Sequence, residues 1–316
     1  MPIFPLGGQS TEVAATTSVN KATERVKRLF DYKRTFTRRS FFCKSPSPFR
    51  IFFARMRTQN MPIQSSFLSI GEQKVHYLQL GEEKKCLLFL HGWGGSAESF
   101  RHFFAPIHAL GFSVMAIDFP SFGLSSPAPE SGWDSADYAV FVEQFLEKFP
   151  QKEWYIFAHS FGGRVACRLL FSRPNAAKKL ILAGAAGIAV PLGKRQKIAQ
   201  LLSKLFSFGK YILGTRITSY IGAKLSGSHD WADADAGEKA SLKKVFAEKD
   251  FRNQLPQIPL PVLLLWGAQD SYTPLFTGKI FQSKLPSATL KIFHDGRHGI
   301  HKTHPEEIIG YLKEFL

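Results

Sequence analysis

The chain has 316 residues, enough for one large α/β domain with an insertion or for two ordinary domains. No run approaches the roughly 20 apolar residues of a membrane span. The net charge is +16, but residues 1–60 hold 12 of the 41 Lys and Arg and only 3 of the 25 Asp and Glu. The other basic residues are scattered and form no stripe interleaved with stacking aromatics. We therefore expect a soluble protein with no nucleic-acid partner and no stable membrane insertion.

Residues 1–60 differ in composition from the rest of the chain, being rich in Arg, Lys, Ser and Phe without a sustained apolar period. Three interpretations remain open: an organelle transit peptide, translation that starts at Met56 or Met61, and a basic arm on a membrane surface. Under all three we expect a disordered leader. We expect a cytoplasmic protein, or one of an organelle matrix if the leader is a transit peptide. The oligomeric state is open.

The three cysteines are widely spaced and odd in number, without the paired spacing of a metal or redox motif. They are Cys43, Cys86 and Cys167. This usage favours a reducing compartment, in which they pack as small apolar residues.

Regular patterns begin at Gln64 and predict a β-hairpin, two buried strands and a helix. The hairpin covers 65–70 and 74–80, the strands cover 86–91 and 112–117, and a helix capped by Asp134 or Ser135 runs to about 149. The first buried strand ends in His91-Gly-Trp-Gly-Gly95, whose glycines let the backbone approach a ligand closely. Ser96 is a candidate cap for the helix that follows.

A serine interrupts the next strand-like run. Trp154 to Ala158 is apolar, Ser160 follows His159, and a helical pattern begins at once. A sharp strand–turn–helix serine of this kind needs small residues two positions before and after it. Ala158 and Gly162 meet that need, with alanine in the place of the first glycine of G-x-S-x-G.

The second half continues the alternation after one interruption. Strands are predicted at 179–183, 261–266 and 289–293, and helices at 276–285 and from Pro305 onward. Between them, residues 188–250 have the pattern of a helical insertion, with helical spacing at 198–206 and again at 240–246. This pattern predicts a parallel sheet covered by helices on both faces, with ligands bound at the carboxyl ends of its strands.

Polar clusters follow several of these strands at their carboxyl ends. They are His91 to Trp93, Ser160, Asp270 and His298, so that serine, acid and histidine come in this order along the chain. A serine hydroxyl needs a base, which imidazole supplies, and a carboxylate orients that imidazole. We assign the donors for the developing oxyanion to the backbone N–H groups of Trp93 and Phe161.

Residues 64–316 resemble the α/β-hydrolase fold superfamily, in its serine-esterase-like and meta-cleavage-product-hydrolase-like branch. The motifs are His91-Gly-Trp-Gly-Gly95, Asp118-x-Pro-x-x-Gly-x-Ser125, Ala158-His-Ser-Phe-Gly-Gly163, Trp266-Gly-Ala-Gln-Asp270 and Gly296-Arg-His298. The resemblance implies Ser160 as nucleophile, Asp270 as acid and His298 as base. It also implies a core of 61–187 and 251–316 and a cap of 188–250. The chemistry needs no metal and no cofactor.

Several residues keep alternative roles. His91, Gly92, His159 and Arg164 are candidate pocket residues, and His159 is equally compatible with simple packing. Asp118 is an alternative acid, although its loop favours a turn-stabilising role. His301 and His304 lie close enough in sequence to His298 to be alternative bases.

The predicted function is hydrolysis of an ester or related acyl bond of a small to medium apolar substrate, through an acyl-enzyme. One alternative is hydrolysis of a carbon–carbon bond in a dienoic keto acid, with Arg164 as a group that could bind the acid. Another is a non-catalytic α/β-hydrolase-like binding protein.

Overall fold

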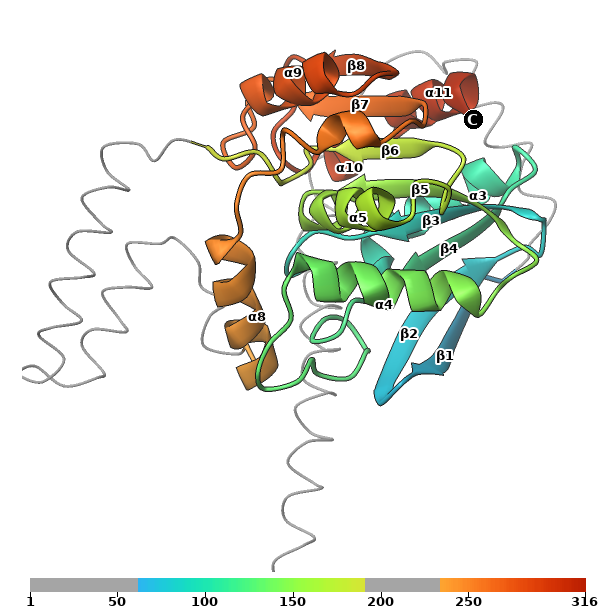
Figure 1. The fold of residues 1–316 in the computed structure, drawn as a ribbon. Helices are drawn as coiled ribbons and strands as arrows, with labels where there is room; N and C mark the ends of the chain where they lie inside the picture. Colours follow the sequence, from blue (N-terminus) through green and yellow to red (C-terminus); the bar gives the residue numbers. More distant parts are fainter. Residues whose placement is uncertain (1–61, 191–233) are drawn as a thin grey trace, which may run out of the picture. The chain divides into compact units, whose positions relative to one another are not determined.

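A computed structural model describes residues 62–190 and 234–316, within one compact unit that spans Met61–Leu316 (Figure 1). The strands of this described part form a single sheet in the order β1-β2-β4-β3-β5-β6-β7-β8. β1 pairs antiparallel with β2, and β2 antiparallel with β4. The remaining neighbours are parallel. The predicted mostly parallel sheet with helices on both faces is confirmed.

The strand bounds differ from the predicted ranges by one residue or none at most ends. The strands are β1 (Gln64–Ile70), β2 (Gln73–Leu80), β3 (Lys85–Leu90), β4 (Ser113–Ile117), β5 (Glu153–His159), β6 (Leu180–Ala183), β7 (Val262–Gly267) and β8 (Ala288–Phe293). The helices are η2 (Ala97–Phe100), α3 (Arg101–His108), α4 (Ser135–Glu147), α5 (Phe161–Ser172), α8 (Ala236–Ala247), η4 (Leu255–Gln257), α9 (Leu275–Lys284), α10 (Ile300–Thr303) and α11 (Pro305–Phe315).

Both faces of the central strands are buried, which explains their continuous apolar sequences. Leu88 and Leu90 of β3 belong to the main core cluster together with residues of α4 and α5. Phe89, between them, stacks on Phe100 and Phe103 at ring-centroid distances of 4.8 and 5.5 Å. Figure 1 shows α4 and α5 on one face of the sheet and α3 on the other.

Helix ends follow the sequence signals at one site and depart from them at another. Asp134 caps α4: its side chain accepts hydrogen bonds from the N–H groups of Ala136 and Asp137, and Asp137 completes a capping box. Ser96 precedes η2, but its side chain makes no capping hydrogen bond, so the cap predicted there is wrong. The short 3-10 turn delays the start of α3 to Arg101.

The predicted insertion at 188–250 is described only in part. The predicted helix at 240–246 is found as α8, whereas the helical spacing at 198–206 lies outside the described residues. α8 packs on the loop before α4, because the Trp133 N–H donates to Ser241 Oγ (2.7 Å) and Lys244 Nζ donates to the Gly132 carbonyl (2.9 Å). The cap assignment stays a prediction.

Candidate active site

Ser160 occupies a sharp turn between β5 and α5. Its backbone φ of 52° and ψ of −113° lie in a region that residues other than glycine rarely adopt. A residue held there costs about 1–3 kcal/mol of free energy. The surrounding backbone holds this turn: Ser160 N–H donates to the Ala183 carbonyl and Gly162 N–H to the His91 carbonyl, both at 3.1 Å. A Cβ at position 162 would lie 2.4 Å from the Leu90 carbonyl oxygen, so only glycine fits.

Ser160, His298 and Asp270 form one hydrogen-bonded chain. Ser160 Oγ lies 2.9 Å from His298 Nε2, and His298 Nδ1 lies 2.7 Å from Asp270 Oδ2. An ionised carboxylate can only accept, so Nδ1 carries the proton and Nε2 is free to accept the serine proton. The fold thus brings together residues from the ends of three elements, as the sequence predicted. Ser160 and His298 are 138 positions apart along the chain.

The Asp270 carboxylate is held by its own loop. Its Oδ1 accepts from the N–H groups of Tyr272 (2.8 Å) and Thr273 (2.9 Å), and Thr273 Oγ1 lies 2.8 Å from Oδ2. Burial opposes ionisation, but the hydrogen bonds from His298 and Thr273 outweigh it and hold the pKa of Asp270 below its usual value. The acid therefore stays ionised at neutral pH.

Sequence reasoning missed Thr273 and Tyr272. Thr273 Oγ1 is also 3.0 Å from the Gly184 carbonyl, and the Thr273 carbonyl accepts from the Trp266 indole (2.7 Å). The exposed ring of Tyr272 lies 5.1 Å from that of His298. The sequence offered only one indication of their role, which is their position two and three residues after Asp270.

The residues of the two predicted oxyanion donors, Trp93 and Phe161, lie in contact with each other. Phe161 is the first residue of α5, where helix N–H groups lack intrahelical partners and the dipole favours negative charge. Trp93 lies in the loop after β3, and the two side chains contact edge to face at 5.0 Å. Gly92 permits this approach, since a Cβ there would lie 2.8 Å from His159 Nδ1 and 3.2 Å from Ser160 Cβ.

His91 stabilises the loop after β3, which contains Trp93. Its Nδ1 lies 2.7 Å from the Gly92 carbonyl, and its Nε2 accepts from Phe119 N–H at 3.0 Å. Accepting at Nε2 requires a neutral ring with the proton on Nδ1. Burial lowers the pKa of His91 and keeps it in that state. These contacts suit a loop-shaping residue.

His159 is buried behind the base. Its Nε2 donates to the His298 carbonyl (3.0 Å), and its ring lies 4.8 Å from the His298 ring and 4.2 Å from the His301 ring. Burial and the neighbouring His298 lower the pKa of His159 to about 3. A neutral ring here supports the backbone and ring of His298 without adding charge.

The alternative bases and the alternative acid have other partners. His301 packs between His159 and Phe100. His304 Nε2 contacts Asp295 at 3.0 Å. Asp118 accepts from His76 Nδ1 (2.8 Å) and from the N–H groups of Ala97 and Leu124. The geometry leaves His298 beside Ser160 and gives Asp118 the turn-stabilising contacts.

Arg164, a candidate group for binding a substrate acid, pairs with groups of the protein itself. Its guanidinium lies 3.0 Å from Glu248 Oε2 and donates to the Lys249 carbonyl at 3.1 Å. Arg168 pairs with the same carboxylate at 3.0 Å. Arg164 thus joins α5 to the segment after α8 and shares one carboxylate with Arg168, and its role in substrate binding stays a prediction.

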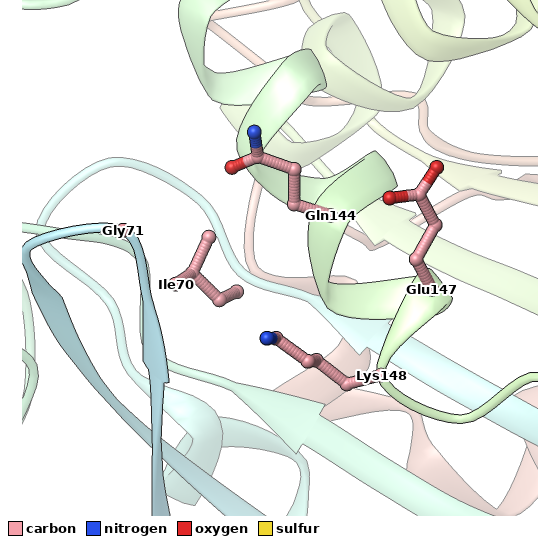
Figure 2. Close-up of a pocket in the computed structure, with 5 residues that line it drawn as sticks. All are labelled: Ile70, Gly71, Gln144, Glu147 and Lys148. Atoms are coloured by element: carbon pink, nitrogen blue, oxygen red, sulfur yellow. The ribbon is translucent and has the colours of Figure 1, made fainter.

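A pocket of about 420 Å³ lies away from Ser160, between the β1–β2 turn and the end of α4 (Figure 2). Its lining residues are Ile70, Gly71, Gln144, Glu147 and Lys148, none of which belongs to the Ser160 site. Among residues 62–190 and 234–316, no group of three or more His, Cys, Asp or Glu could hold a metal ion. Within the same ranges, no helix is long and apolar enough to cross a bilayer.

Known proteins resemble the chain in sequence and in fold. It is 24% identical over 284 residues, 84% of the chain and 95% of the relative, to 2-hydroxy-6-oxononadienedioate/2-hydroxy-6-oxononatrienedioate hydrolase 2 of Pseudomonas putida. The esterase EaEST from Exiguobacterium antarcticum superposes with a TM-score of 0.63 at 20% identity, over 80% of this chain and 99% of the esterase. The bromoperoxidase from Bacillus anthracis gives 0.62 at 20% identity, over 80% and 99%.

The structural matches support the fold, and a family profile supports the ancestry. The profile described as "Alpha/beta hydrolase family" matches residues 87–310, from within β3 to within α11. This range holds the loop after β3, the elbow, the Asp270 loop and His298. The resemblance inferred from the motifs is confirmed, and the chain belongs to the alpha/beta hydrolase family.

Proposed function

We propose that the protein is a serine hydrolase that cleaves an ester or related acyl bond through an acyl-enzyme. The observation that carries the proposal is the chain of two hydrogen bonds from Ser160 through His298 to Asp270, which begins at a strained turn. Backbone strain of this kind persists where the surrounding structure enforces it, often at sites where the strain is part of the mechanism. A serine that served only as a turn residue would not need an ordered base beside it.

In the proposed acylation step, His298 Nε2 takes the proton of Ser160 as Oγ attacks the carbonyl carbon. The negative charge that develops on the carbonyl oxygen is stabilised by the N–H groups of Trp93 and Phe161. The imidazolium then gives its proton to the leaving alcohol as the ester bond breaks. Asp270 stabilises the imidazolium and keeps its orientation, so its low pKa serves the step directly.

Deacylation repeats the same movements with water. His298 removes a proton from water, the resulting hydroxide attacks the acyl carbon, and the proton returns to Ser160 as the acid leaves. Since His159 donates to the His298 carbonyl and stays neutral, the proton has one imidazole acceptor beside Ser160.

A second candidate is hydrolysis of a carbon–carbon bond in a dienoic keto acid. The relative from Pseudomonas putida, whose name describes such a substrate, favours it. The pairing of Arg164 with Glu248 weighs against it, because the cation expected to bind the acid is already paired. A non-catalytic binding protein remains the third candidate, and the ordered Ser160–His298 contact argues against it.

The decisive experiment is labelling of the full chain with a fluorophosphonate probe, read by intact mass and peptide mapping. We expect an adduct at Ser160 that is absent from Ser160→Ala and forms far more slowly in His298→Ala. A folded parent without any adduct at Ser160 would overturn the proposal and favour the binding protein. Comparing the turnover rates of p-nitrophenyl esters with those of a dienoic keto acid then separates the two hydrolase candidates. A large preference for the keto acid would favour carbon–carbon bond hydrolysis over ester hydrolysis.

A further inference from the structure

A second serine, histidine and aspartate form a hydrogen-bonded chain on another part of the sheet. Ser65 Oγ of β1 lies 2.8 Å from His76 Nε2 of β2, and His76 Nδ1 lies 2.8 Å from Asp118 Oδ2 after β4. Strand register explains the contact: Phe67 pairs with His76, so Ser65, two residues earlier on the same face, is the diagonal neighbour of His76.

His76, like His298, contacts an aspartate through its Nδ1. Asp118 is an ionised acceptor, because hydrogen bonds from His76 and from the N–H groups of Ala97 (2.6 Å) and Leu124 (2.8 Å) lower its pKa despite its burial. His76 therefore donates through Nδ1, and in the neutral imidazole its Nε2 is left to accept from Ser65. The ring is 2% exposed, so water competes little for either nitrogen.

Ser65 is an exposed residue although its base is buried. Its strand, β1, is the terminal strand of the described sheet. The ring of Phe67 is 47% exposed and lies 5.1 Å from that of His76, with Lys74 Nζ 4.5 Å from its centroid. An apolar electrophile can therefore rest against Phe67 beside the serine.

We propose that Ser65 is a second activated serine, a modification site that reacts with small phosphonylating and acylating agents. With diethyl fluorophosphate, a Ser65 Oγ–P bond forms, the P–F bond breaks and fluoride leaves. The serine proton passes to His76 Nε2 and then to water. The product is a stable phosphate ester, so the site reacts once and does not turn over.

Ser65 and Ser160 each have a general base beside them but differ in the groups that would stabilise an oxyanion, so we expect different rates of labelling. General-base assistance contributes about 10²- to 10⁴-fold, and His76 can supply it. Ser65 lies inside a strand and has no helix N-terminus behind it, whereas Ser160 precedes α5. Since one oxyanion donor is worth about 10²- to 10³-fold, we expect Ser65 to react slower than Ser160 by at least that factor.

The test uses the full chain carrying Ser160→Ala, treated with diethyl fluorophosphate and mapped by peptide mass spectrometry. We expect an adduct at Ser65 that disappears in Ser160→Ala/Ser65→Ala and persists in Ser160→Ala/Ser66→Ala. Ser66 is the matched control, because it precedes Phe67 directly and so faces the other side of β1. In Ser160→Ala/His76→Asn, labelling of Ser65 should fall about 10²-fold.

Folding of the His76 variant is checked in a chain that keeps Ser160: His76→Asn alone must label Ser160 at the parental rate. If it does not, the His76 variant is replaced by Ser160→Ala protein unfolded in urea. We expect the adduct at Ser65 to be absent from that unfolded protein. Ser65 labelled no faster than Ser66, or as fast in the unfolded chain, would overturn the proposal and leave the chain of hydrogen bonds with a purely structural role. Labelling of Ser65 without labelling of Ser160 in the parent would sink the proposed function alone.

Discussion

The two Ser–His–Asp chains have nearly the same hydrogen-bond lengths but different backbones. Ser160 reaches Asp270 through contacts of 2.9 and 2.7 Å, and Ser65 reaches Asp118 through two contacts of 2.8 Å. Ser160 lies at a strained turn before a helix, whereas Ser65 lies within a regular strand. The two serines thus share the arrangement of a general base and differ in the backbone that would stabilise the oxyanion, so the comparison separates the effects of these two parts of a site.

The largest effect is expected from Asp270→Asn. Asparagine can donate to Nδ1, so the ring would adopt the other tautomer and lose its ability to accept the Ser160 proton at Nε2. We expect turnover of a p-nitrophenyl ester to fall about 10⁴-fold with little change in the circular dichroism spectrum. A loss of less than tenfold would mean that Asp270 does not orient the base.

The elbow itself is tested by Gly162→Ala. The added Cβ would lie 2.4 Å from the Leu90 carbonyl, so the turn must shift. A displacement of about 1 Å lowers reactivity about 10²-fold, which the rate of fluorophosphonate labelling at Ser160 measures. Gly310→Ala in α11 is the matched control, because nothing lies within 4 Å of its added Cβ. Equal labelling in both variants would contradict the role given to the turn.

The second chain is tested by Asp118→Asn, which should change stability rather than turnover. The substitution weakens the acceptor for His76 and for the N–H groups of Ala97 and Leu124, and we expect the free energy of unfolding in urea to fall by about 1–3 kcal/mol. Turnover per folded molecule should stay within about threefold of the parent, since Asp118 has no contact with the Ser160 chain. Asp295→Asn, at an exposed carboxylate, should leave stability close to that of the parent, because water screens its contact with His304. A tenfold loss of turnover in Asp118→Asn would couple the two chains.

The stability difference between the parent and Asp118→Asn should depend on pH. The folded pKa of Asp118 lies below its ordinary value of 3.8, so its contribution is complete above that value and is lost as pH falls through the folded pKa. Urea unfolding of both proteins across this range should show the difference shrinking only below about pH 4. A difference that shrinks between pH 6 and 8 would point to another group.

The smallest effect is expected at two cysteines, which are better nucleophiles than serine but are buried. Burial raises the pKa of Cys86 and of Cys167 to about 12, so thiolate is scarce at neutral pH. In a Cys43→Ser chain, a thiol reagent should leave both residues unmodified in the native state and modify them after unfolding in urea. Rapid labelling of either cysteine in the native protein would contradict the burial and the raised pKa from which this prediction follows.

The sequence predicted the fold well because the fold depends on local period and on burial of whole strands. It also predicted the contact of Ser160, Asp270 and His298, because chain order and the strand ends restrict where these residues can meet. Thr273 was missed since its role depends on the shape of one loop. Ser65 and His76 were missed because their contact depends on strand register. The pairing of Arg164 with Glu248 was not predicted, because Glu248 lies 84 residues away in sequence.

The two ends of the insertion are joined to each other at the core. Phe251 N–H donates to the Gly187 carbonyl (3.2 Å), and Ala189 N–H donates to Asp250 Oδ2 (2.8 Å). Arg164 and Arg168 bind Glu248 just before this joint. The cost of closing a chain segment between two fixed points grows only slowly with its length, so a joint of this kind sets where the segment starts and ends and not how long it is. Changes in the number of residues between the two sides should therefore be tolerated as long as the contacts of Gly187, Ala189, Asp250 and Phe251 are kept.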